Sequence, residues 1–189
     1  RLTGSTAIDT DPAASQGATI TAGTSYPSIT KGTNGTLYVT TLDAQDQFVL
    51  ICSTTCGTAS NWAEDNGGSP GELANEGQLL VPLPNGDAMF IMNDTSLSDI
   101  LTKVYTGGNW DAGYATVDSN AADNTTYDQQ MAAAVDPLTG DIYLAYLADV
   151  NTFGRNDDIR TAVYSGGAWN AGTADVLTDD IRGLASVSI

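Results

Sequence analysis

A nine-residue motif that occurs twice constrains the fold of this 189-residue chain more than any other feature. The segment YTGGNWDAG begins at Tyr105, and the segment YSGGAWNAG begins at Tyr164, 59 positions later. Similar segments at a fixed spacing are typical of repeat proteins, in which one supersecondary unit recurs along the chain. We therefore expect a fold assembled from units of comparable length.

Each repeat contains four short apolar runs, and a fainter third copy of the pattern lies nearer the N-terminus. The second run follows a glycine and the third begins with an aspartate, at Gly35, Gly86 and Gly140 and at Asp46, Asp99 and Asp158. Short runs bounded by Gly, Asn and Asp predict β-strands joined by tight turns. Four antiparallel strands in 51 to 59 residues are typical of one β-propeller blade, whereas each sandwich domain needs about 100 residues.

The amino-acid composition agrees with an all-β chain that is rich in turns. The sequence contains 20 Asp but 3 Glu, together with 25 Thr and 20 Gly. Because Asp favours turns and caps whereas Glu favours helix interiors, the excess of Asp argues against helices. Residues 128–135 (DQQMAAAV) have some helical character, but the run is short and Asp136-Pro137 follows it, so we expect a strand there.

These boundaries predict an all-β fold, a β-propeller of four-stranded antiparallel blades with three complete blades and a partial blade at each end. We assign an outer strand and linker to residues 1–22, complete blades to residues 23–75, 76–127 and 128–182, and the first strand of a further blade to residues 183–189.

Closed propellers have about 4–8 blades, so three cannot close a ring. We therefore expect strand-completing partners, either the rest of a longer propeller or neighbouring copies of this chain. The start at Arg1 rather than Met fits a processed or excised chain.

The charge of the chain excludes several classes of partner. The formal net charge is −17, from 6 basic and 23 acidic residues, and such a field repels nucleic acids and anionic lipids. No apolar run approaches the roughly 18 residues of a membrane span, so we expect no membrane insertion. The chain has no His, which excludes Ser-His-Asp and Cys-His catalytic groups within it.

The two cysteines, Cys52 and Cys56, lie in the longest of the turns that precede the repeated tryptophan. A zinc site needs about four ligands, and two Cys without any His make a poor one. We therefore predict a disulfide between Cys52 and Cys56, which implies an oxidising compartment. Glycosylation sequons at Asn34, Asn93 and Asn124 agree with an extracellular or cell-surface location.

The turn between the third and fourth strands ends in Gly-x-Trp and resembles that of the sialidase-like, Asp-box (BNR-repeat) propellers. The chain retains Gly107 with Trp110, and Gly166 at the start of the corresponding turn with Trp169, but it lacks the Asp and the Thr of that family's turn. The resemblance implies the propeller fold. Sialidase activity would further require three arginines that bind a carboxylate and a Tyr nucleophile, and no such triad emerges from the four arginines of this chain.

Several predicted loops gather the oxygen-bearing side chains that calcium prefers. Calcium takes about six to eight oxygen ligands, and the segments NDTSLSD (93–99) and GRNDD (154–158) are the strongest candidates. We predict no cofactor, with calcium as the one candidate that stays open, and its candidate ligands are Asn93, Asp94, Asp99, Asp157 and Asp158. Asx-turns explain the same composition, and no segment matches the EF-hand pattern.

The repeated tryptophans Trp62, Trp110 and Trp169 leave two interpretations open. They either close each blade by packing against the next sheet or line sugar-binding pockets between blades. Their recurrence in every repeat favours packing as a structural role.

These patterns together predict a protein that is not an enzyme. The expected function is that of a non-catalytic, extracellular β-propeller segment, acting as a structural scaffold or as an assembly and adhesion module. The alternatives are a carbohydrate-binding, lectin-like propeller with glycan partners and a non-catalytic part of a glycoside hydrolase. Abundant Asp also leaves glycoside hydrolysis by paired carboxylates open in a longer parent chain.

Overall fold

The structure is a computed structural model of the chain, and it describes residues 25–43, 46–58, 61–64, 78–94, 99–119, 121, 131–149 and 157–177. The regular elements within these ranges are 13 β-strands, which confirms the prediction of an all-β chain with antiparallel sheets. The predicted terminal strands at 1–22 and 183–189 lie outside the described residues.

The strands form three antiparallel sheets in chain order. Sheet 1 contains β1 (Ser25–Lys31), β2 (Leu37–Asp43), β3 (Asp46–Cys52) and β4 (Ala63–Glu64). Sheet 2 contains β5 (Gln78–Pro82), β6 (Ala88–Asp94), β7 (Asp99–Thr106), β8 (Asn109–Trp110) and β9 (Ala115–Asp118). Sheet 3 contains β10 (Met131–Val135), β11 (Ile142–Asp149), β12 (Asp157–Ser165) and β13 (Ala168–Leu177).

The fourth strand of the repeat differs between sheets. In sheet 3 it is the continuous strand β13, whereas in sheet 2 it is divided into β8 and β9, which both pair with β7. The Gly-Gly turn before it is the same in both sheets. Gly107 and Gly108 have φ values of 59° and 96°, and Gly166 and Gly167 have 63° and 89°. Two successive residues with positive φ suit a two-residue hairpin turn, which explains why the motif contains two glycines.

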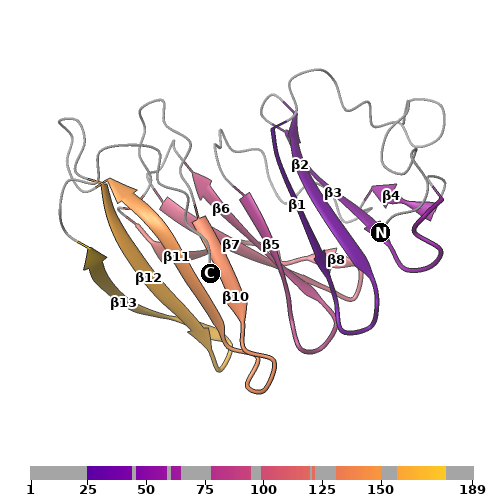
Figure 1. Cartoon of the computed structure of the whole chain (residues 1–189). Helices are drawn as coiled ribbons and strands as arrows, with labels where there is room; N and C mark the ends of the chain where they lie inside the picture. The colour runs from indigo at the N-terminus through magenta and orange to yellow at the C-terminus, as the bar shows by residue number, and fades with distance from the viewer. Residues whose placement is uncertain are drawn as a thin grey trace.

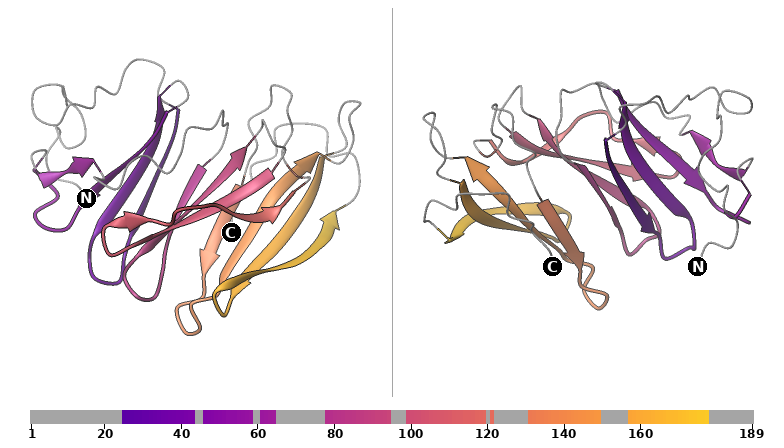
Figure 2. Two further views of the ribbon diagram at one scale, coloured as in Figure 1. Left: turned by 180° about the vertical axis from the view of Figure 1, so that it is seen from behind. Right: turned by 45° about the horizontal axis from the view of Figure 1, so that its top comes forward.

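The three sheets stand side by side in an open arc, with sheet 2 in the middle (Figures 1 and 2). The first strands of the sheets contact one another in the order β1, β5, β10. One apolar cluster, which includes Tyr38, Val49 and Phe90, fills the space between sheets 1 and 2. A second cluster, which includes Ile91 and Leu144, fills the space between sheets 2 and 3.

Strand β6 shows why the sequence of the central sheet is so apolar. All seven of its residues are buried. Phe90 and Met92 belong to the cluster shared with sheet 1, and Met89 and Ile91 belong to the cluster shared with sheet 3. Because successive residues of a strand point to opposite faces, a sheet covered on both sides needs apolar residues at nearly every position.

Candidate functional site

Acidic side chains gather at one end of sheet 2, which we call the loop end: β6 and β9 finish there and β7 begins there. Asp94 is the last residue of β6 and lies directly opposite Asp99, the first residue of β7. Asp118 is the last residue of β9 and lies opposite Ile100. The antiparallel register therefore brings three carboxyl groups from three strands to the same end of the sheet.

Asp118 connects sheet 2 to sheet 3 through a buried polar network. Its Oδ2 accepts hydrogen bonds from the Tyr146 hydroxyl and from Arg160 Nη1, each at 2.8 Å. The Asp118 and Arg160 side chains form a largely buried ion pair, and Tyr146 is fully buried on β11. A buried carboxylate is tolerated when it is paired and hydrogen-bonded, so this network fixes the two sheets at the loop end.

Asp99 differs from its neighbours because its side chain is only partly buried. Burial raises its pKa above the usual value for an aspartate, and the nearby charges of Asp94 and Asp118 raise the pKa further. A carboxyl group that keeps its proton to higher pH can act as a general acid. Among the three carboxyl groups of the loop end, Asp99 is therefore the one that solvent reaches, since Asp94 and Asp118 are buried.

The structure places the predicted metal ligands in strands rather than in loops. Asn93 and Asp94 are the last two residues of β6, and both are fully buried. Neither side-chain polar atom of Asn93 has a hydrogen-bond partner among the described residues. Asp157 and Asp158 begin β12, and their side chains lie outside the described part of the structure.

Calcium binding stays a prediction. No group of three or more His, Cys, Asp or Glu side chains in the described ranges is arranged to hold a metal ion. Strand pairing explains why the prediction of a loop at Asn93 and Asp94 was wrong: β6 extends to Asp94, and only residues 95–98 separate it from β7.

The indole N–H groups of the three repeated tryptophans have different environments. Trp62 Nε1 donates to the Cys56 carbonyl oxygen at 2.9 Å, within its own turn. Trp169 Nε1 donates to Thr102 Oγ1 at 3.0 Å, across the boundary between sheets 3 and 2. Trp110 Nε1 is buried and has no partner among the described residues. Trp110 instead packs edge-on against Phe90 and Tyr105, at ring-centroid distances of 6.1 and 5.2 Å.

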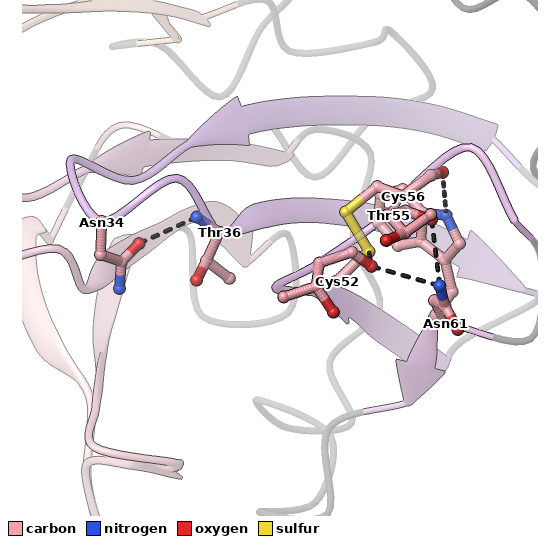
Figure 3. The surroundings of a disulfide bond; sticks show 8 residues. Asn34, Thr36, Cys52, Thr55, Cys56 and Asn61 are labelled. Atoms are coloured by element: carbon pink, nitrogen blue, oxygen red, sulfur yellow. Dashed lines mark hydrogen bonds between the residues drawn. A yellow bond between two sulfur atoms is a disulfide. The ribbon is translucent and has the colours of Figure 1, made fainter.

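A disulfide joins Cys52 and Cys56, as the sequence predicted. Figure 3 shows the bridge beside Asn61, whose Nδ2 donates to the carbonyl oxygens of Thr54 and Thr55. Thr55 has a φ of 52°, an unusual value for a residue other than glycine. The bridge and these hydrogen bonds hold the turn that supplies the acceptor for Trp62.

The candidate glycosylation sites fall in three environments. Asn34 is exposed in the turn after β1, where its Oδ1 accepts a hydrogen bond from the Thr36 backbone N–H (Figure 3). Asn93 is buried, as described above, and Asn124 lies outside the described residues. Among the described residues, no helix has the length and apolar character needed to cross a membrane.

A cavity of about 470 Å³ lies between sheets 2 and 3, toward the end that carries the Gly-Gly turns. Its lining combines aromatic, hydroxyl and carboxyl side chains with two glycines, and consists of Met89, Thr102, Val104, Asp111, Gly113, Tyr114, Ala115, Thr116, Tyr164, Gly167, Ala168 and Trp169. Trp169 is the one repeated tryptophan in this lining. The volume of the cavity lies within the range of small-molecule sites, about 300–1,000 Å³.

Tyr114 lines this cavity and is electrostatically distinctive. Burial, and to a lesser extent the charge of Asp94, raise the pKa of its hydroxyl to about 12. The Lys103 ammonium lies 4.7 Å from the centre of the Tyr114 ring, a cation–π contact. Burial lowers the pKa of Lys103, and the nearby Asp111 opposes that effect. The Tyr114 hydroxyl therefore keeps its proton at physiological pH.

Comparison with known proteins supports the fold. No protein-family profile matches the chain, and no characterised protein matches it in sequence. The chain is similar in structure to an α-L-arabinanase from Penicillium chrysogenum, solved in complex with arabinobiose, with a TM-score of 0.55 and 15% identity over 84% of this chain. An α-L-arabinofuranosidase from Clostridium thermocellum gives a TM-score of 0.48 and 11% identity over 79% of this chain, and we base no argument on it. The chain spans about half the length of these proteins, 50% and 48%.

The likeness corrects two expectations. It shows a fold of the β-propeller type, but the finer assignment to Asp-box propellers is unsupported, because no family profile matches. The prediction that the chain is not an enzyme is contradicted, since the similar arabinanase structure is that of a glycoside hydrolase. The scaffold and adhesion roles gain no support from these comparisons.

Proposed function

We propose that this chain is part of a β-propeller glycoside hydrolase that cleaves a neutral, arabinose-containing polysaccharide. The proposal is supported by the likeness to the arabinanase over 84% of this chain. Because the chain corresponds to half of that enzyme, the complete active site would include residues beyond the three sheets described. The disulfide supports an extracellular location, in which a secreted enzyme would meet such polymers.

The observation that carries the proposal is the position of Asp99. Hydrolysis of a glycosidic bond needs a carboxylic acid that protonates the departing sugar oxygen and a second carboxylate that assists attack at the sugar carbon. Asp99 is partly exposed at the loop end, and its pKa is raised by burial and by two further carboxyl groups. We assign the proton-donor role to Asp99.

Sheet 3 has a face that suits a further sheet of the same repeat. Tyr38, Met89 and Tyr143 occupy the same position, three residues after the turn glycine of each repeat. The first two are buried against the following sheet, with 3% and 1% of their surface exposed, whereas Tyr143 is 44% exposed. Thr102 in β7 accepts the hydrogen bond from Trp169 of the following sheet. Thr161 occupies the corresponding position in β12 of sheet 3. We therefore propose that the rest of a longer propeller packs on this face.

The test uses the natural protein that contains this chain, with linear arabinan as substrate and release of reducing ends as readout. Asp99→Asn should lower kcat by about 100-fold or more, because general acid catalysis contributes about 10²–10⁴-fold. Asp141→Asn is the matched control, since Asp141 lies in the turn before β11, at the opposite end of the sheets. A wild-type protein that releases no sugar from arabinan or from other neutral polysaccharides would overturn the proposal.

A further inference from the structure

The cavity between sheets 2 and 3 has a lining that includes none of the loop-end carboxyl groups Asp94, Asp99 and Asp118. It is bordered by β7 and β9 on one side and by the turn between β12 and β13 on the other. We propose that this cavity binds one end of a neutral oligosaccharide, as a site separate from the position of bond cleavage. The choice of carbohydrate as ligand rests on the proposed function.

The aromatic part of the site comes from Tyr164 and Trp169, whose ring centroids lie 5.4 Å apart with an interplanar angle of 58°. The hydrogen bond from Trp169 Nε1 to Thr102 Oγ1 fixes the orientation of the indole ring. Aromatic rings of this kind offer apolar surface to the C–H groups of a sugar, while polar groups beside them form hydrogen bonds with its hydroxyl groups.

Trp169 is unlike its two counterparts in the repeat. Trp62 is 6% exposed and packs in the apolar cluster of sheet 1. Trp110 packs against the cluster between sheets 1 and 2, and Trp169 packs in the same way against the cluster between sheets 2 and 3. Only Trp169 borders the cavity. If the repeated tryptophan had only a structural role, no cavity would be needed beside Trp169.

The polar part of the site comes from Asp111, Tyr114 and Thr116, which all line the cavity. Asp111 and Thr116 are exposed, so their oxygen atoms can form hydrogen bonds with a ligand without first leaving a buried position. The Tyr114 hydroxyl, with a pKa of about 12, remains a donor at physiological pH. Carboxylate and hydroxyl groups beside aromatic rings match the alternating polar and apolar surface of a sugar.

The charge of the site selects for neutral sugars. None of the residues that line the cavity is Lys or Arg, and Asp111 contributes a negative charge. The whole chain carries a formal charge of −17. A sugar acid would therefore meet repulsion from the negative charge of the chain, which Lys103, the cation beside Asp111 and Tyr114, offsets only in part.

Binding to the natural protein tests this proposal, with arabinobiose as the neutral probe, digalacturonic acid as the acidic probe and isothermal titration calorimetry as the method. Arabinobiose should bind, and Asp111→Ala should weaken its binding by about tenfold or more, because a hydrogen bond to a charged group contributes about 1.5–3 kcal/mol. Trp169→Phe, which keeps an aromatic ring, should weaken binding less than Trp169→Ala. Asp141→Ala is the control and should bind as the wild type does.

Three outcomes would overturn the proposal: no binding of arabinobiose, binding that Asp111→Ala and Trp169→Ala leave unchanged, or equal binding of digalacturonic acid. Thermal melting of each variant identifies those that fail to fold, and Asp111→Ala changes only an exposed side chain. The binding result is independent of hydrolysis. Arabinobiose binding that depends on Asp111, in a protein without hydrolytic activity, would keep this site and reject the proposed function.

Discussion

Trp169 Nε1 donates a hydrogen bond to Thr102 Oγ1 at 3.0 Å, and this bond links sheet 3 to sheet 2. The preceding copy of the motif has no such bond, because Trp110 Nε1 is buried without a partner among the described residues. The position in sheet 1 that corresponds to Thr102 is Val49, which lies in the apolar cluster against which Trp110 packs. One repeated motif therefore forms two different sheet interfaces, which differ in the residue at the position of Thr102 and in the division of the fourth strand of sheet 2 into β8 and β9.

Thr102→Val should destabilise the protein by about 1–3 kcal/mol, because it leaves the Trp169 N–H without its acceptor in a partly buried position. It also removes the bond from Thr102 Oγ1 to the Ala115 carbonyl oxygen, at 3.3 Å. Urea denaturation of the variant and the wild type measures the difference. Thr106→Val is the control, since Thr106 is exposed on the same strand and should change stability little. Equal effects of the two variants would contradict the role of this bond.

Val49→Thr should have the opposite effect. A hydroxyl group at this position would give the Trp110 N–H the acceptor that Trp169 already has, and a net hydrogen bond contributes about 1 kcal/mol. We expect a gain in unfolding free energy of about that size, measured by the same denaturation. A lower unfolding free energy would mean that the new hydroxyl group is buried without a hydrogen-bond partner and that the two sheet interfaces are not equivalent.

Arg160→Met should cost about 3–5 kcal/mol, because it leaves the Asp118 carboxylate buried without its cation. The double variant Asp118→Leu, Arg160→Met should cost much less, since it removes both charges together. Thermal or chemical denaturation of the two single variants and the double variant measures the coupling between the side chains. Additive effects would show that the 2.8 Å contact contributes nothing of its own.

Local features of the fold were predictable from the sequence, whereas contacts between sheets were not. The Gly-Gly turns and the apolar strands follow from short segments such as residues 105–113, so their positions could be read from the repeat. The contacts of Asp118 with Tyr146 and Arg160 span 28 and 42 residues and depend on how two sheets face each other. The sequence signal was present but ambiguous, because Asp118 begins a polar segment that also suits turns.

Stability and function should change in opposite directions at Asp99. Its folded pKa is raised above the unfolded value, so the folded protein binds the proton more tightly and loses stability as pH rises through the folded pKa. Asp99→Asn removes the ionisable carboxyl group and with it this loss of stability. The melting temperature of the variant should therefore exceed that of the wild type at neutral pH. The difference should disappear below the unfolded pKa of 3.8, where the carboxyl is protonated in both states. The assignment would be contradicted if the melting temperature of Asp99→Asn, relative to that of the wild type, were lower at pH 7 than at pH 3.

The most direct test of the central claim combines turnover and melting temperature of the natural protein and its Asp99→Asn variant at neutral pH. We expect the wild type to release sugars from linear arabinan, and we expect the variant to melt at a higher temperature but to have a kcat lower by about 100-fold or more. An Asp99→Asn variant that hydrolyses arabinan at the wild-type rate would contradict the role of Asp99. A wild-type protein without activity on any neutral polysaccharide would contradict the claim that this chain belongs to a glycoside hydrolase.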